Sequence, residues 1–215
     1  MDLIRGFFSL FSDLHGTLTA VATHSAAMSY LFIAGIIFVE TGFVFMPFLP
    51  GDSLLFATGA LSATGTFEIT LLLPILWAAA VLGDTVNYSI GRTLGKHIVR
   101  KGMIKKEHYD KAQAFSHRHG NYAVVLARFF PILRTIVPFV AGMSNMPYAS
   151  FFFYNVIGGI TWVTLFVICG FFFGNIPFVQ AHFEIIVLSI ILISFAPLMY
   201  QAVQATRQSR KSSSK

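Results

Sequence analysis

The stretch VFMPFLPGDSLLFATGAL, residues 44–61, combines the hydropathy of a membrane segment with residues that interrupt helices. Its centre holds two prolines, a glycine, a carboxylate and a hydroxyl, namely Pro47, Pro50, Gly51, Asp52 and Ser53. Non-helical backbone at membrane depth is tolerated only where it is buried in protein or lines a wet cavity. The stretch therefore predicts a re-entrant hairpin over about residues 47–65, which enters and leaves by the same side of the bilayer.

The composition of the whole chain agrees with a membrane environment. The 215 residues are 55% hydrophobic and 11% charged, with a mean hydropathy of +0.71. Soluble domains are nearer about 45–50% apolar and about 25% charged. The sequence therefore predicts an integral membrane protein, and its single cysteine excludes an intramolecular disulfide framework.

Hydropathy divides the chain into four candidate spans, given that about 20 residues cross the hydrocarbon layer. They cover roughly residues 27–46, 69–91, 149–174 and 184–205. Another apolar region, 121–143, is broken by prolines and charges, and it predicts a second re-entrant hairpin. The expected fold is an all-α polytopic bundle with two opposed re-entrant hairpins in an inverted repeat. Interrupted segments at matching places in two halves are the best sequence pointer to a transport site.

A weak sequence similarity between the two halves accompanies this predicted repeat. Gly91 and Gly95 stand four residues apart in one half, as Gly170 and Gly174 do in the other. Small residues at this spacing allow close helix approach. Helix packing alone therefore explains the shared glycine spacing as well as an internal repeat does.

The charges predict the domain organisation and the orientation. We expect an interfacial amphipathic helix at 1–26, a single membrane domain at 27–206 and a basic disordered tail at 207–215. Within that domain, a basic linker at about 92–120 interrupts the spans. Lysine and arginine concentrate in the linker and the tail, which places both, and both termini, on the cytoplasmic side. Anionic inner-leaflet lipids are the expected partner of these segments. The net charge of +6 does not predict nucleic-acid binding, because aromatic stacking residues are not interleaved with the charges.

Five ionisable residues lie within or beside apolar segments: Glu40, Asp52, Asp84, Arg128 and Arg134. Each would cost about 2.5–3.5 kcal/mol if isolated at the bilayer centre, so we expect pairing, hydration or a function. A purely structural interpretation is that Asp84 pairs with Asn87, or Arg128 with Glu40, to hold helices together. The functional interpretation is favoured for Glu40, Asp52 and the two arginines because of the neighbouring helix breaks.

The second hairpin suggests what the arginines bind. On an unbroken helix, Arg128 and Arg134 would point about 240° apart, but a break at Pro131 lets them converge, and a further break is expected at Pro138. Thr135 would then lie at the start of a half-helix, as Ser53 does in the first hairpin. Two guanidinium groups beside a helix N-terminus suit a phosphate. We therefore predict that Arg128, Arg134, Ser53 and Thr135 bind it.

The carboxylates suggest how binding is controlled. Removal from water favours protonation of a carboxylate, whereas a nearby arginine opposes it. We therefore hypothesise that proton exchange at Glu40 or Asp52 opens and closes an ion pair with Arg128 or Arg134. Such exchange would couple a proton gradient to phosphate binding.

Other chemistry has little support in the sequence. His117 and His119, with His108 upstream, lie on a basic segment typical of headgroup-level residues, and we predict no metal site. There is no glycine-rich ATP-binding loop and no histidine motif of a lipid-phosphate phosphatase. We expect no cofactor and no enzymatic activity.

Four ordered motifs carry a family resemblance. FxExGxxxxPFLPGDSLLFxxGAL (38–61), GDxxNYxIGRxxG (83–95), HG (119–120) and ARFxPxxRTxxPFVAGM (127–143) resemble the DedA family of bacterial inner-membrane proteins. Its wider superfamily comprises the SNARE-associated and VTT-domain proteins. The resemblance implies an important acidic pair at Glu40 and Asp52 and an arginine pair at Arg128 and Arg134. We expect Asp84, Asn87 and Arg92, in the second motif, to support the site.

The resemblance also implies a function. Family members are linked to recycling of undecaprenyl phosphate across the inner membrane and to the proton-motive force, whereas superfamily relatives scramble phospholipids. We expect a lipid transporter that moves undecaprenyl phosphate. A phospholipid scramblase, a proton-coupled transporter of a small cation or drug, and a non-transport envelope scaffold remain alternatives. The oligomeric state is left open, a homo-oligomer included.

Overall fold

The computed structural model describes residues 26–43, 51–101, 106–130 and 133–176, and every regular element in these ranges is a helix. The elements are, in order, α3 (Ala26–Gly42), α4 (Gly51–Ala63), α5 (Ile69–Arg100), α6 (Lys106–His119), the 3-10 helix η1 (Gly120–Tyr122), α7 (Ala123–Ala127), α8 (Leu133–Met143) and α9 (Tyr148–Gly174). The predicted all-α class is therefore confirmed for the described part of the chain.

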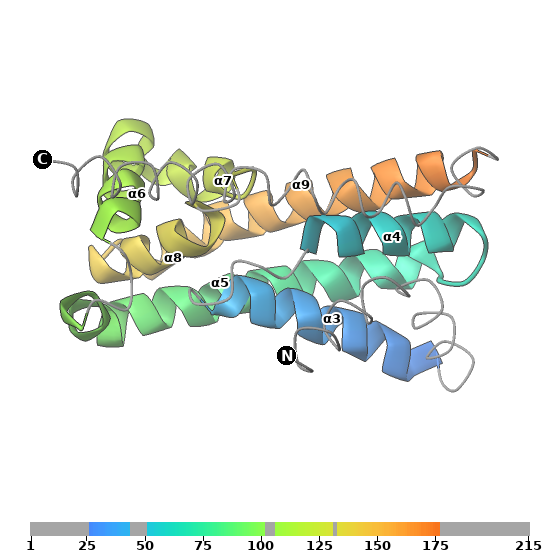
Figure 1. Ribbon diagram of the computed structural model, residues 1–215, viewed down its shortest axis with the longest axis horizontal. Coiled ribbons are helices and arrows are strands. Elements are labelled where there is room, and N and C mark those ends of the chain that lie inside the picture. The colour runs from blue at the N-terminus through green and yellow to red at the C-terminus, as the bar shows by residue number, and fades with distance from the viewer. Residues whose placement is uncertain (1–25, 44–50, 102–105, 131–132, 177–215) are drawn as a thin grey trace, which may run out of the picture.

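Two long helices, α5 and α9, form the frame and run along the long axis of the molecule (Figure 1). The segments Ile69–Gly95 and Tyr148–Gly174 are each 27 residues long and apolar enough to cross a membrane. At about 1.5 Å per residue each is roughly 40 Å long, more than the hydrocarbon thickness of about 30 Å. Both helices expose large apolar side chains suited to contact with lipid, including Leu71, Leu82, Phe153, Leu165 and Phe172.

Two short helices pack against this frame in a crossed pattern. α4 lies beside α9, and α8 lies beside α5, toward opposite ends of the molecule (Figure 1). At each crossing a glycine of either helix meets backbone of the other so closely that a Cβ would overlap a carbonyl oxygen. The four glycine–carbonyl contacts are Gly59 with Val167, Gly170 with Phe56, Gly142 with Tyr88, and Gly91 with Phe139. Gly91 and Gly170, from the two glycine pairs of the sequence, thus lie at equivalent crossings.

Two apolar cores flank the middle of the bundle. The first joins α3, α4, α5 and α9 and contains the fully buried Trp162. The second joins α5, α6, α7 and α8 and contains Ala127 and Val137. The arginines predicted at the site stand beside residues of the second core, Arg128 next to Ala127 and Arg134 three residues from Val137. The charged site therefore lies between two apolar regions.

Several helix boundaries in the structure differ from those predicted from the sequence. α3 ends at Gly42 rather than near 46, and α5 continues past 91 to Arg100, so the first part of the predicted linker is a helix. The predicted span at 184–205 and the tail at 207–215 lie outside the described residues. So does the N-terminal helix predicted at 1–26, apart from Ala26, which begins α3. The re-entrant and inverted-repeat arrangement stays a prediction.

Candidate functional site

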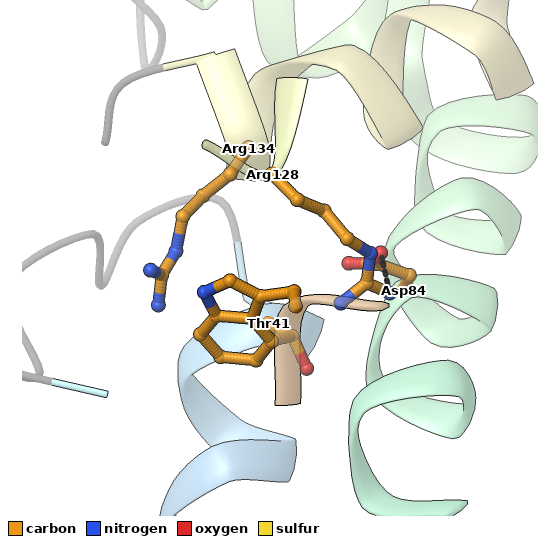
Figure 2. Close-up of a pocket in the computed structure, with 5 residues that line it drawn as sticks. Thr41, Asp84, Arg128 and Arg134 are labelled. Carbon is orange, nitrogen blue, oxygen red and sulfur yellow. Dashed lines mark hydrogen bonds and ion pairs between the residues drawn. The ribbon is translucent and has the colours of Figure 1, made fainter. Parts of the chain in front are cut away.

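A small cavity lies where α3, α5, α7, α8 and α9 meet. It has about 10 Å³ of space, roughly what one water molecule needs, and is lined by Thr41, Asp84, Arg128, Arg134 and Trp162. Figure 2 shows the side chains of the two arginines diverging from neighbouring starting points, with Arg128 ending at Asp84. Pockets for small molecules usually measure about 300–1,000 Å³, so this structure represents a closed arrangement.

Arg134, in the first turn of α8, binds two carboxylates from two different helices. Its Nη1 lies 2.8 Å from Asp52 Oδ1 on α4, and its Nη2 pairs with Glu40 Oε1 on α3. The Glu40 side chain is 2% exposed, whereas that of Asp52 is 19% exposed. Arg134 therefore joins the two helices that flank the first break, and Asp52 is its more accessible partner.

Arg128, which follows α7, is held by the two long helices instead. Its Nη2 lies 2.5 Å from Asp84 Oδ2 on α5, 2.6 Å from Asn155 Oδ1 on α9 and 3.4 Å from the Ala80 carbonyl oxygen. Asn155 is itself fixed, because its Nδ2 donates to the Val81 carbonyl at 3.0 Å. Arg128 and its side-chain partners are thus anchored to the frame.

Gly158 makes room for the arm of Arg128. A Cβ added to this glycine would lie 3.1 Å from the Arg128 Cδ and 3.2 Å from its Nε. The close approach of α9 thus helps fix Arg128 along the frame.

Trp162, on α9, contacts both arginines and one acid. The guanidinium carbons of Arg134 and Arg128 lie 4.7 Å and 5.7 Å from its ring centroid, within the range of cation–π attraction. Its Nε1–H donates to Asp52 Oδ1 at 3.0 Å. Trp162 therefore connects the two arginine sites.

The start of α4 is occupied by a carboxylate from α3. The Gly51 N–H donates to Glu40 Oε1 at 3.2 Å, where the positive end of the helix dipole favours an anion. A Cβ on residue 51 would overlap the Glu40 carboxylate. A side chain at this position would displace the Glu40 carboxylate, which in the structure reaches both the helix start and Arg134.

The predicted hydroxyl ligands are buried close to this cluster. Ser53 lies in the first turn of α4, and Thr135 follows Arg134 in α8. Thr135 Oγ1 has no hydrogen-bond partner among the described residues. Its carbonyl accepts a 2.7 Å hydrogen bond from Asn87 Nδ2, which also donates to the Thr41 carbonyl at 3.1 Å. Asn87 thus fixes α3 and α8 against α5.

The ion pairs differ from those considered for a purely structural role. Asp84 pairs with Arg128 rather than with Asn87, and Glu40 pairs with Arg134 rather than with Arg128. The reason is helix rotation, which sequence spacing does not fix. Arg92 is exposed and donates to Tyr88 Oη at 3.4 Å, away from the described ion pairs.

The helix breaks are only partly as predicted. α3 ends at Gly42 and the next described helix begins at Gly51, while α7 ends at Ala127 and the next described helix begins at Leu133. Pro47, Pro50 and Pro131 lie outside the described residues. The prediction of a break at Pro138 is wrong, because this proline lies inside α8. A helical proline removes one backbone hydrogen bond, which neighbouring helices in membrane proteins tolerate.

The cluster carries an excess of negative charge. Three carboxylates, Glu40, Asp52 and Asp84, face two guanidinium groups. With every group ionised, the sum is one negative charge in a region removed from water, which is costly. Uptake of a proton or another cation would balance it.

Three residues of the site, Thr41, Asn155 and Trp162, were not predicted from the sequence. Asn155 and Trp162 lie on α9, outside every motif that carries the family resemblance. An amide within a 27-residue apolar helix was a signal for Asn155, because buried polar groups require partners. Trp162 offered no such signal, since tryptophan is common in apolar helices.

The fold and the site together define an integral membrane protein that encloses a cluster of paired charges. The VTT domain model matches residues 49–172. The chain belongs to the DedA family of VTT-domain membrane proteins. It is 40% identical over 214 residues to Protein DedA of Escherichia coli K12, covering 96% of this chain and 97% of that protein.

Other relatives support the same assignment. An uncharacterized membrane protein of Mycobacterium leprae is 42% identical over 183 residues, with 83% of this chain and 82% of that protein covered. Inner membrane protein YghB of E. coli K12 is 34% identical over 178 residues, with 81% of each chain covered. No solved structure matches the chain.

Proposed function

We propose that this protein is a transporter of a lipid phosphate, most specifically undecaprenyl phosphate, across the bacterial inner membrane. Its headgroup would bind at the arginine cluster, and protonation of a carboxylate would open the binding site. The family membership supports membrane location, and the buried cluster supports the substrate class. The observation that carries the proposal is the Arg134 ion-pair network, in which two carboxylates satisfy one buried guanidinium.

The chemistry of the cluster suits an anionic headgroup. Arginine presents a planar fork of donors that matches phosphate oxygens. Arg134 points separate nitrogens at two oxygens, one from Glu40 and one from Asp52. A phosphate offers two oxygens of its own and would replace these acceptors, while Thr135 Oγ1 supplies a further donor.

The charge balance supports coupling to protons. Protonation of Asp52 or Glu40 removes an acceptor charge from Arg134 and leaves the guanidinium available to a phosphate. Deprotonation restores the ion pair and expels the headgroup. Proton uptake and phosphate binding would therefore occur together, and the proton-motive force would drive net movement.

The helix arrangement supports access from both leaflets. α4 has 13 residues and α8 has 11, and both are shorter than the ~20 residues needed for a crossing. They lie toward opposite ends of the frame (Figure 1) and cross it through matched glycine contacts. These features favour two opposed re-entrant hairpins in an inverted repeat. Cytoplasmic termini are proposed from the distribution of lysine and arginine alone.

The test is transport by the pure protein in vesicles. Undecaprenyl phosphate movement between leaflets is followed with and without a pH gradient, and Arg134→Ala is the control. We expect gradient-dependent flux that Arg134→Ala abolishes, and amide variants at Glu40 and Asp52 that no longer respond to pH. Flux that ignores the gradient would indicate a scramblase, and no flux would refute transport of this lipid.

A further inference from the structure

Asp52 Oδ1 is held by two N–H donors from two different helices. Arg134 Nη1 lies 2.8 Å away and Trp162 Nε1 lies 3.0 Å away. An anionic oxygen that accepts one guanidinium N–H and one indole N–H has the surroundings expected of a bound phosphate oxygen. The two donors thus form a site for an oxyanion, and an internal carboxylate occupies it.

The donors are fixed, whereas the acceptor is accessible. Trp162 is 1% exposed and Arg134 is 7% exposed. The guanidinium carbon of Arg134 lies 4.7 Å from the Trp162 ring centroid, and that of Arg128 lies 5.7 Å from it. The Asp52 side chain is 19% exposed and lies in the first turn of α4, beside the helix break. If the start of α4 moved, the Asp52 carboxylate would leave and another anion could take its place, while Arg134 and Trp162 stayed where they are.

We propose that Trp162 is a headgroup-binding residue and that Asp52 stands in for the phosphate in the closed arrangement. This inference rests on the proposed function and adds Trp162 to the residues that bind the headgroup. The incoming phosphate displaces Asp52 Oδ1 and accepts hydrogen bonds from both Arg134 Nη1 and the indole Nε1. Because an indole nitrogen only donates, this position selects an acceptor oxygen and rejects the ammonium of a zwitterionic headgroup.

A structural role for Trp162 predicts something different. If the indole only packs and provides cation–π contacts, phenylalanine would preserve its function in part, and the hydrogen bond would not affect lipid binding. Trp77 offers a matched control, since its Nε1 donates to Thr164 Oγ1 at 3.1 Å on the same pair of long helices. Trp77→Phe removes an equivalent hydrogen bond that the cavity does not use.

The experiment measures equilibrium binding of undecaprenyl phosphate to the full-length protein in phosphatidylcholine vesicles, with undecaprenol as the uncharged control. In the Asp52→Asn background, where no carboxylate competes for the indole N–H, the gain of a hydrogen bond to a charged group on binding predicts about tenfold weakening when Trp162→Phe is added. Trp77→Phe should bind like the wild type. Asp52→Asn should bind more tightly than the wild type, because the competing charge is gone. Thermal unfolding without lipid tests whether each variant is folded.

Each outcome separates the two proposals. Lipid phosphate that fails to bind the wild type overturns the proposed function, and this inference with it. Wild-type binding, with no further weakening when Trp162→Phe is added to Asp52→Asn, overturns only the role of Trp162. If Trp162→Phe does not fold, the Trp77→Phe protein retains Trp162 as its single tryptophan. Its emission should then change with undecaprenyl phosphate but not with undecaprenol, and an unchanged emission would refute the contact.

Discussion

The two buried arginines share a cavity and a tryptophan, yet their surroundings differ. Arg128 directs one nitrogen at acceptors on α5 and α9, the helices that form the frame. Arg134 directs two nitrogens at carboxylates on α3 and α4, the helices on either side of a break. The difference indicates that Arg128 stabilises the frame of α5 and α9, whereas Arg134 holds together α3 and α4, which can separate.

This contrast refines the prediction that Arg128 and Arg134 contribute equally to phosphate binding. Each partner of Arg128 is almost fully buried and lies on a continuous helix, so opening that site would require the frame itself to part. Opening the Asp52 side of the Arg134 site requires only that the start of α4 moves. We therefore assign substrate binding mainly to Arg134 and positioning mainly to Arg128.

The largest effect is expected from Arg134→Met. The variant removes the phosphate-binding fork, and the loss of two charge-assisted hydrogen bonds predicts about a hundredfold or greater fall in transport. It also leaves Glu40 buried without its arginine, which typically costs about 3–5 kcal/mol. Flux and thermal unfolding measure the two effects, and normal flux would contradict the assignment.

Arg128→Met should reduce stability by a similar amount, about 3–5 kcal/mol, because Asp84 would be left buried and unpaired. Adding Asp84→Leu should recover most of this loss, since replacing both charges of a buried pair is often nearly neutral. Chemical denaturation of the single and double variants provides the measurement. A double variant as unstable as the single one would show that Arg128 matters for more than its pairing.

The sequence allowed part of this contrast to be predicted. The motif around Gly51 predicted a helix break with an acid beside it, and the hydropathy predicted an all-helical membrane protein. Which acid meets which arginine was not predictable, because it depends on the rotation and tilt of α3 and α5. Trp162 was missed because nothing in an apolar helix marks the side that faces a charge.

Pro138 illustrates the opposite error. Its position suggested a helix break, yet α8 continues through it. Local propensity disfavours proline inside a helix, but the buried packing of α8 against α5 outweighs one lost hydrogen bond. Tertiary contacts thus decided what the local pattern could not.

Glycine substitutions probe the two arginine sites with a smaller change. Gly51→Ala places a methyl group against the Glu40 carboxylate and should cost about 1–3 kcal/mol, as other overpacked sites do. Gly158→Ala should cost less, because its added methyl group would lie no closer than 3.1 Å to Arg128 and 3.2 Å to the Val125 Cα. Gly35→Ala in α3 is the control, because no atom lies within 4 Å of its added Cβ. Thermal unfolding should rank the three in this order, and equal effects would refute the proposed crowding.

Lysine substitutions should give the smallest effects and should distinguish the sites chemically. Lysine is a point charge without a planar fork. Arg134→Lys should therefore reduce transport by about tenfold, the equivalent of one lost hydrogen bond to a charged group. Arg128→Lys should retain most activity, because a single ammonium can serve acceptors that now share one nitrogen. Transport rates of the two variants in matched vesicles test this, and the reverse order would exchange the roles.

The most direct measurement compares two charge-neutralised pairs in the vesicle transport assay. Arg128→Met with Asp84→Leu removes the scaffold pair, and Arg134→Met with Glu40→Leu removes the pair at the break. We predict that the first protein still moves undecaprenyl phosphate, whereas the second is folded but inactive. Transport by the second protein, or its loss in a folded first protein, would contradict the division between the two arginines.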